Sequence, residues 1–307
     1  MSIEMIGPEA EACLSWDGLV QALIAGHSLP RAEIADTFLY RRADTLLNRA
    51  AWIDGLGQLV KTATIFPGNA ALGTPTINGG VCLYSDATGA LEAVIDFHLV
   101  TKWKTAGDSL LSARQLARPD SRSILIVGAG TVARSMAEAY RSAFPQARFT
   151  FWNRSPAGAE ALAAATGGTA TTDLEAAVRA ADIIATATMS HDPVIRGDWL
   201  QPGTHLDLIG AYRPDMREAD DEALTRARIF VDSRATTIGH IGELKDPIAR
   251  GVISESDVVA DFYDLAKGTY DRRGPDEITL AKNGGGAHLD LMTAAYILAA
   301  WRARPSR

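Results

Sequence analysis

A short apolar strand that leads through glycines into a helix constrains this chain more than any other feature. The run ILIV (124–127) is continuously apolar, which is typical of a strand covered on both faces. It is followed by Gly128-Ala129-Gly130-Thr131-Val132-Ala133, the G-x-G-x-x-A form of the dinucleotide-binding fingerprint. Gly128 permits a tight turn, Gly130 lets the backbone approach a pyrophosphate, and Ala133 lets the helix pack closely on the strand. The N–H groups at Thr131 and Val132, where the helix begins, suit phosphate, so we expect this segment to bind a dinucleotide.

Strands and helices alternate after this motif. Strands are predicted at RFTFWN (148–153), DIIATAT (182–188), HLDLIGA (205–211) and RIFVDS (228–233). Helices are predicted at SPAGAEALAAATG (155–167), TDLEAAVRAA (172–181) and ADDEALTRA (219–227). This alternation predicts an α/β fold with a doubly wound parallel sheet of the Rossmann type.

A polar, proline-bearing linker, ARPDSRS (117–123), precedes the parallel-sheet region. Before the linker we expect a helix from Trp16 to Ala25, capped by Ser15 or Asp17. A strand at LVKTATIF (59–66), a Gly/Pro/Asn loop, a hairpin over 81–97 and a helix over 101–117 should follow it. From Thr279 to Ala303 we expect a loop and then an apolar helix that returns to the first domain. The prediction is a Rossmann domain at 119–284 and a discontinuous α+β domain at 1–118 plus 285–307.

Composition excludes several functional classes for these 307 residues. Hydrophobic residues are 47%, charged residues 22% and the net charge is −7, which fits a globular protein and disfavours nucleic-acid binding. No apolar run reaches the roughly 18 residues of a membrane span, and no secretory signal is visible, so the predicted location is the cytoplasm. Cys13 and Cys82 are expected to be buried, reduced thiols. The six histidines lack zinc-site spacing, and we predict no metal.

The residues at the end of the second Rossmann strand indicate whether the domain prefers NAD or NADP. An acidic residue there would bind the ribose 2′-hydroxyl of NAD, but this chain has Asn153-Arg154-Ser155. A guanidinium beside a hydroxyl suits a 2′-phosphate, so NADP(H) is favoured and NAD(H) stays possible; the alternative is a solvated surface arginine. Later strand ends supply Thr188, Gly210 and Ala211, which we also assign to the cofactor.

Several motifs in order make the chain resemble the ornithine cyclodeaminase and mu-crystallin family along nearly its whole length. They are the loop KTATIFPGNAALGTPTINGG, the hairpin VCLYSDATGALEAVID, TKWKTAGDS, GAGTVA, WNRS, GAYRPDMRE and KNGGGAHLD. The resemblance implies a nicotinamide cofactor and a homodimer built through the non-Rossmann domain, which would also bind the substrate. Its members include cyclodeaminases, amino-acid dehydrogenases and imino-acid reductases.

The resemblance also implies roles for particular residues. Lys61 matches a catalytic lysine beside the reacting carbon and nitrogen, and Arg31 matches an arginine that binds the substrate carboxylate. A second carboxylate-binding arginine is replaced by Lys104, which keeps the charge but lacks the bidentate fork. Thr76 and Asn78 match polar positions near the substrate and the nicotinamide.

The residues alone leave alternatives open at the lysines and at the last glycine run. Lys61 is either a rim residue with its stem on the core or a buried amine with a lowered pKa. Asp108 follows Lys104 by four, so the two could form an ordinary helix ion pair. The run 284–286, beside His288 and Asp290, is expected near the nicotinamide or is a bare helix-entry loop.

A second departure concerns the choice of reaction. Tyr212 stands where cyclodeaminases of the family carry a catalytic aspartate, which disfavours ring closure with ammonia loss. We predict that the protein is an enzyme, an NAD(P)H-dependent reductase of a small imino acid. The favoured substrate is 1-pyrroline-2-carboxylate, which would be reduced to proline, and iminosuccinate or another acyclic imino acid is the next candidate. The alternatives are an ornithine cyclodeaminase and a non-catalytic NADP-binding protein like mu-crystallin.

Overall fold

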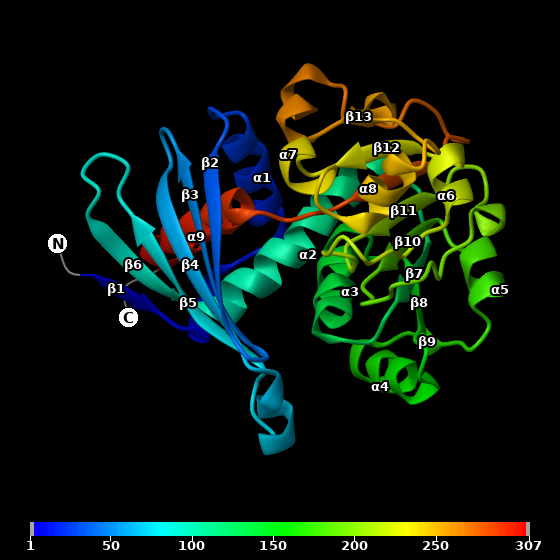
Figure 1. Ribbon diagram of the computed structural model, residues 1–307. Coiled ribbons are helices and arrows are strands. Elements are labelled where there is room, and N and C mark those ends of the chain that lie inside the picture. Colours follow the sequence, from blue (N-terminus) through cyan, green and yellow to red (C-terminus); the bar gives the residue numbers. More distant parts are fainter. Residues whose placement is uncertain (1–2, 305–307) are drawn as a thin grey trace. The chain divides into compact units, whose positions relative to one another are not determined.

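The chain divides into two compact units in the computed structural model, which describes residues 3–304 (Figure 1). The first unit is Met1–Lys104 with Gly286–Arg307, and the second is Thr105–Gly285. Helix α2 (Phe97–Leu116) contains the boundary between them, whereas the sequence placed the domain boundary after that helix, at 118/119.

A six-stranded sheet forms the body of the first unit. Its order is β1-β6-β5-β4-β3-β2, with β1 parallel to β6 and every other neighbouring pair antiparallel. The strands are β1 (Glu4–Ile6), β2 (Glu33–Arg41), β3 (Asp44–Ile53), β4 (Gly57–Ile65), β5 (Ile77–Tyr84) and β6 (Leu91–Asp96). Strand β4 alternates buried and half-buried residues, as expected when one face of a sheet is covered.

Two helices cover one face of this sheet. Helix α1 (Trp16–His27) packs on α9 (Ala287–Arg302), and α9 contacts β3 and β4 (Figure 1). Ser15 caps α1 by accepting a hydrogen bond from the backbone N–H of Gly18 at 3.1 Å. The 3-10 segments η1 (Pro8–Cys13) and η2 (Pro67–Leu72) complete the unit, and η2 lies in the predicted loop. The return of the last helix to the first unit is confirmed.

An eight-stranded parallel sheet forms the body of the second unit, in the order β13-β12-β14-β11-β10-β7-β8-β9. Its strands are β7 (Ser123–Val127), β8 (Arg148–Trp152), β9 (Thr169–Ala170), β10 (Ile183–Thr186), β11 (His205–Leu208), β12 (Arg228–Val231), β13 (Val258–Ala260) and β14 (Thr279–Lys282). The central strands are buried because both faces of the sheet are covered; β7 and β10 are mainly apolar, whereas β11 and β14 also bury polar side chains, among them Asp207 and Lys282. The predicted α/β class with a doubly wound sheet is confirmed.

Helices α3 (Thr131–Ala143), α4 (Pro156–Thr166), α5 (Leu174–Arg179), α6 (Asp221–Arg226), α7 (Arg234–Thr237) and α8 (Gly242–Ala249) flank this sheet, with η3 (Gly197–Trp199), η4 (Glu255–Asp257) and η5 (Phe262–Lys267). None of the helices between residues 3 and 304 combines the length and the apolar character that a membrane crossing needs.

The structure corrects two sequence expectations. Strand β14 (Thr279–Lys282) lies within the sheet between β12 and β11, where a loop was expected. Only four residues long and followed by Asn283 and glycines, it carried too little periodicity to be recognised. Cys13 and Cys82 are free thiols, as expected, but they are half-buried rather than buried.

Candidate functional site

A line of charged side chains crosses the first unit's sheet on the face that α9 covers. Asp36 of β2 lies opposite Arg49 of β3, and Arg49 lies opposite Lys61 of β4. Directly opposed residues of antiparallel strands share a face, so the three side chains form one row. The Arg49 guanidinium donates to Asp36 at 2.7 Å. The Lys61 ammonium donates to Oδ1 of Asp290, in the first turn of α9, at 2.8 Å.

The sequence left two interpretations of Lys61 open, a rim residue or a buried amine, and in the structure Lys61 is a buried amine. Its residue is 5% exposed, and its ammonium also lies 4.7 Å from the centre of the Phe97 ring. Burial lowers the pKa of Lys61, the charge of Asp290 opposes that shift, and the charge of Lys104 adds to it. An amine whose pKa is pulled below its ordinary value is better placed to exchange a proton near neutral pH.

Asp290 is the most important residue of this group that the sequence did not assign a role. It is fully buried; burial alone would raise its pKa, but Lys61, Lys104 and Arg49 together hold the pKa below its ordinary value. Its Oδ2 accepts no hydrogen bond among the residues described, and Arg49 approaches it only to 3.8 Å. A buried carboxylate oxygen with unused acceptor capacity suits a donor that arrives with a ligand.

Lys104 supplies a further cation to this group. It is half-buried in α2, and its charge acts on both Lys61 and Asp290. Within residues 3–304 its ammonium has no hydrogen-bond or ion-pair partner, so the helix ion pair with Asp108, which the sequence left open as an alternative, is not formed. Arg31 is exposed in the turn between α1 and β2, and its charge contributes to a pKa of about 4 for His27, mostly a result of burial.

The two polar residues expected near the substrate lie at the start of β5. Asn78 pairs with Thr64, three residues after Lys61, so the pleat places Asn78 on the opposite face of the sheet from Lys61. Its side-chain amide donates to the carbonyl of Pro75 at 3.0 Å. Thr76 is half-buried, and its carbonyl accepts from the N–H of Phe66 at 2.8 Å. The structure therefore does not bring Asn78 to Lys61.

In the second unit, the glycine motif lies at the carboxyl end of β7. Gly128 has a φ of 116°, and a Cβ there would meet the Ala187 carbonyl oxygen at 2.6 Å, so only glycine fits. Gly130 is the N-cap of α3, no side chain caps that helix, and a Cβ at Gly130 would meet nothing within 4 Å. Uncapped N–H groups facing open space fit a pyrophosphate.

Asn153, Arg154 and Ser155 follow the neighbouring strand β8. The Asn153 amide donates to the Ser155 carbonyl at 3.0 Å and holds this turn. Arg154 is exposed, and its guanidinium has no partner in the described part of the chain, so it can bind an anion. Thr188 follows β10, and Gly210 and Ala211 follow β11.

These residues, which the sequence predicts to bind the cofactor, share one edge of the sheet. The strand order places β11, β10, β7 and β8 side by side and parallel, so their carboxyl ends meet there, and the chain order reverses between β10 and β7. Such a switch point is where open α/β sheets bind nucleotides. Tyr212, just after Ala211, is 58% exposed.

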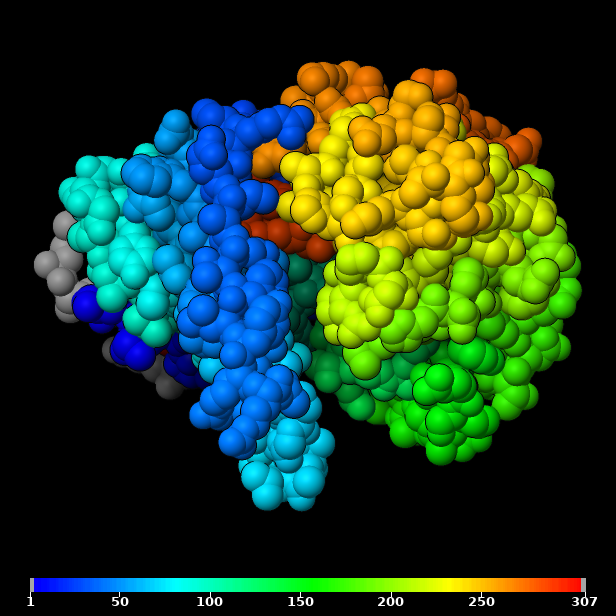
Figure 2. Space-filling view, in the orientation of Figure 1, coloured from blue at the N-terminus to red at the C-terminus, as the bar shows by residue number. Residues whose placement is uncertain are grey.

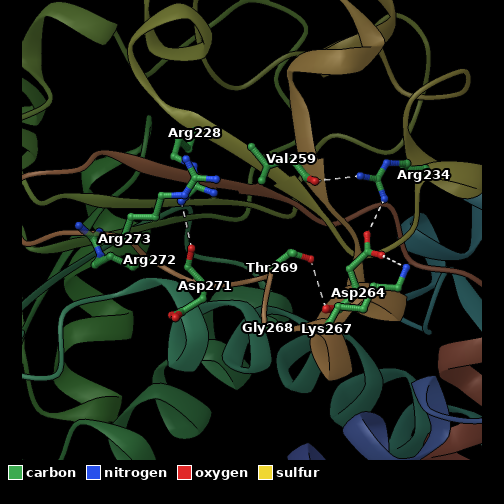
Figure 3. Close-up of a pocket in the computed structure, with 10 residues that line it drawn as sticks. All are labelled: Arg228, Arg234, Val259, Asp264, Lys267, Gly268, Thr269, Asp271, Arg272 and Arg273. Carbon is green, nitrogen blue, oxygen red and sulfur yellow. Dashed lines mark hydrogen bonds and ion pairs between the residues drawn. The ribbon is translucent and has the colours of Figure 1, made fainter.

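A separate hollow of about 700 Å³ lies beside β12 and β13 (Figure 3). It is lined by Arg228, Arg234, Val259, Asp264, Lys267, Gly268, Thr269, Asp271, Arg272 and Arg273. Its charges largely satisfy one another: Arg234 and Lys267 each donate to Asp264 at 2.8 Å, and Arg228 binds Glu277. We therefore assign no ligand to it. No group of side chains suited to a metal ion occurs among the described residues.

Comparison with known proteins places the chain. Residues 54–304 match the model of the ornithine cyclodeaminase/mu-crystallin family. The chain belongs to this family. The Delta(1)-pyrroline-2-carboxylate reductase of Paracoccus denitrificans is 52% identical over 296 residues, 94% of this chain and 94% of that protein.

Two solved structures have the same fold as this chain. An archaeal alanine dehydrogenase dimer with bound NAD has a TM-score of 0.88 at 28% identity, covering 100% of this chain and 98% of that one. The Delta(1)-pyrroline-2-carboxylate reductase of Thermococcus litoralis, in complex with NADH and L-proline, has a TM-score of 0.88 at 24% identity, covering 99% and 100%. At that identity the second shows the fold alone.

Proposed function

We propose that the protein is an NAD(P)H-dependent reductase of a small imino acid, with 1-pyrroline-2-carboxylate, reduced to proline, as the best substrate. The observation that carries the proposal is the buried Lys61–Asp290 pair together with the cation of Lys104, which has no partner among the residues that the structure describes. The 52% identity to a Delta(1)-pyrroline-2-carboxylate reductase supports the same reaction.

The residues divide the work of this reaction. A bound nicotinamide dinucleotide supplies hydride for the carbon of a C=N bond. Lys104 and Arg31 hold the substrate carboxylate, which fixes the orientation of the imine. Lys61 donates a proton or a hydrogen bond to the imine nitrogen as that nitrogen gains electron density. Asp290 holds Lys61 in place and keeps it charged, and its Oδ2 can accept an N–H of the substrate.

Arg49 favours a substrate with one carboxylate over a dicarboxylate such as iminosuccinate. A second carboxylate would need a further cation, and Arg49 lies in the same row as Lys61. Its guanidinium, however, already donates to Asp36 at 2.7 Å and lies 3.8 Å from Asp290. Recruiting Arg49 would break these ion pairs, so we expect iminosuccinate to be the poorer substrate.

The first test measures NADPH oxidation with 1-pyrroline-2-carboxylate, iminosuccinate and ornithine. We expect stoichiometric oxidation with the first, a lower kcat/KM with the second, and no proline or ammonia from ornithine plus NAD. Tyr212 offers a phenol hydroxyl where a cyclodeaminase would have a carboxylate, and a phenol hydroxyl cannot take the proton from an ornithine side-chain amine as a carboxylate can. Ammonia release with NAD unchanged would establish a cyclodeaminase, and NADPH binding without turnover of any imino acid would establish a binding protein.

NADP(H) is the proposed cofactor, because the exposed Arg154 guanidinium has no partner in the described chain and can bind a 2′-phosphate. Arg154→Ala should weaken NADPH binding by about 1.5–3 kcal/mol, the range for charge-assisted hydrogen bonds, and leave NADH binding nearly unchanged. Titration of both cofactors by fluorescence measures this. Arg148→Ala, at the exposed start of β8, is the matched control. Equal losses for both cofactors would remove Arg154 from 2′-phosphate recognition.

A homodimer is the proposed assembly, and the edge strand β2 is the proposed interface. Every residue of β2 is exposed, and Figure 2 shows this blue strand on the surface of the first unit. Phe38, Leu39 and Tyr40 are 47%, 58% and 74% exposed, on both faces of a strand whose one neighbour among the described strands is β3. An apolar, unpaired edge is a poor surface for a monomer. The archaeal alanine dehydrogenase is likewise a dimer.

Phe38→Lys should dissociate the dimer, because a two-fold axis places the new charge in the interface twice. We expect the dimer dissociation constant, measured by sedimentation equilibrium, to rise about a hundredfold or more. The control is Met189→Lys, which changes a side chain of the second unit that is 74% exposed. A Phe38→Lys protein that stays as dimeric as the control would place the interface elsewhere.

A further inference from the structure

Glu218 is a fully buried carboxylate that the mechanism above does not use. It has no ion-pair partner in the part of the chain that the structure describes, although removing a carboxylate from water is costly. Four donors satisfy it instead. Oε1 accepts from the backbone N–H and the hydroxyl of Thr188 at 2.8 and 2.7 Å, and Oε2 accepts from the N–H groups of Gly210 and Ala211 at 2.7 and 3.1 Å.

These donors come from two different loops. Thr188 follows β10, Gly210 and Ala211 follow β11, and the two strands are neighbours in the sheet. The loops are in close contact, since a Cβ at Gly210 would lie 2.1 Å from the Thr188 carbonyl oxygen. Glu218 therefore joins the backbones of both loops at the carboxyl edge of the sheet.

Glu218 is itself held rigidly. Its backbone N–H and that of Ala219 donate to the buried carboxylate of Glu243 at 2.7 and 3.0 Å. Its carbonyl accepts from the N–H groups of Val194 and Ile195, at 2.9 Å each. The side chain thus starts from a fixed backbone, and the positions of the two loops follow from it.

Topology indicates which part of a dinucleotide these loops meet. The pyrophosphate belongs at the N-terminus of α3, after β7, and the adenosine ribose belongs at the end of β8. The loops after β10 and β11 lie on the other side of β7, where the other half of a dinucleotide must extend. We propose that Glu218 is a positioning residue that fixes these two loops for the nicotinamide half of the cofactor. The inference rests on the proposed dinucleotide site.

Glu218→Gln tests this inference. The glutamine side chain has the same size as that of Glu218, but its NH₂ group would face N–H groups that now donate to a carboxylate oxygen. The affinity for NADPH should fall about tenfold or more, whereas that for 2′-phospho-ADP-ribose, which lacks the nicotinamide, should be unchanged. Glu222→Gln, at an exposed position of α6, is the matched control and should change neither. Equal losses of both ligands, or no loss of NADPH affinity, would overturn the proposal.

A second variant covers the case in which Glu218→Gln does not fold. Glu243→Gln alters the carboxylate that accepts from the backbone N–H groups of Glu218 and Ala219, and so loosens the backbone from which the Glu218 side chain starts. We expect it to lower the affinity for NADPH severalfold, again without loss of affinity for 2′-phospho-ADP-ribose. An unchanged NADPH affinity, or an equal loss for both ligands, would contradict the inference. If the wild type binds NADPH but reduces no imino acid, the proposed reaction fails while these binding tests still decide the role of Glu218.

Discussion

Replacing Lys61 by methionine should lower kcat with 1-pyrroline-2-carboxylate by about a hundredfold or more, the contribution expected of a positioned acid. Methionine fills the same space beside the Phe97 ring but has no proton to give to the imine nitrogen. NADPH binding should be unchanged, because the residues proposed to bind the dinucleotide belong to the second unit. Steady-state kinetics and a fluorescence titration measure the two effects separately.

The control for this variant must separate chemistry from stability. Lys61→Met removes the hydrogen-bonded partner of the buried Asp290 and leaves it the more distant cations of Arg49, at 3.8 Å, and Lys104; removing one partner of a buried ion pair costs about 3–5 kcal/mol. Adding Asp290→Asn removes that charge, so the double variant should recover part of the stability without recovering turnover. Lys245→Met, at an exposed position of α8, controls for the substitution itself. Near-native turnover in the Lys61→Met protein would remove Lys61 from the mechanism.

The sequence predicted the parts of the fold that depend on local pattern. The strand β7, the turn at Gly128 and the helix α3 follow one another in the chain, so their residues specify them directly. The burial of Lys61 was left open, because its apolar neighbours in VKTATIF are equally compatible with a rim position. The structure decided it through α9, which covers that face of the sheet.

Long-range partners could not be predicted in the same way. Asp290 reaches Lys61 across 229 residues of sequence, and nothing in the local pattern of either segment specifies that pairing. The row formed by Arg49 and Lys61 depends on strand register, which the sequence did not fix. Glu218 ended the recognised motif GAYRPDMRE, but its four donors come together only in the folded sheet.

Asp290→Asn should move the alkaline limb of the kcat/KM profile to lower pH. In the proposed mechanism Lys61 acts in its protonated form, so activity should be lost as pH rises through its pKa. Burial lowers that pKa, and the negative charge of Asp290 raises it again. Asparagine has no charge, so the pKa of Lys61 falls further. The protonated fraction, and with it kcat/KM, then disappears at lower pH.

The comparison is internally controlled, because both proteins are assayed with the same imine and any titration of the substrate affects both profiles equally. Asparagine can still accept the Lys61 hydrogen bond through its amide oxygen, so the geometry of the pair at 2.8 Å is conserved while its charge is not. A neutral amine is also less costly to bury beside that amide than an ammonium, so the variant should fold. A purely structural role for Asp290 would lower activity evenly at every pH. A displaced alkaline limb, with the loss of kcat/KM smallest at low pH, is the result that assigns Asp290 the control of the charge on Lys61.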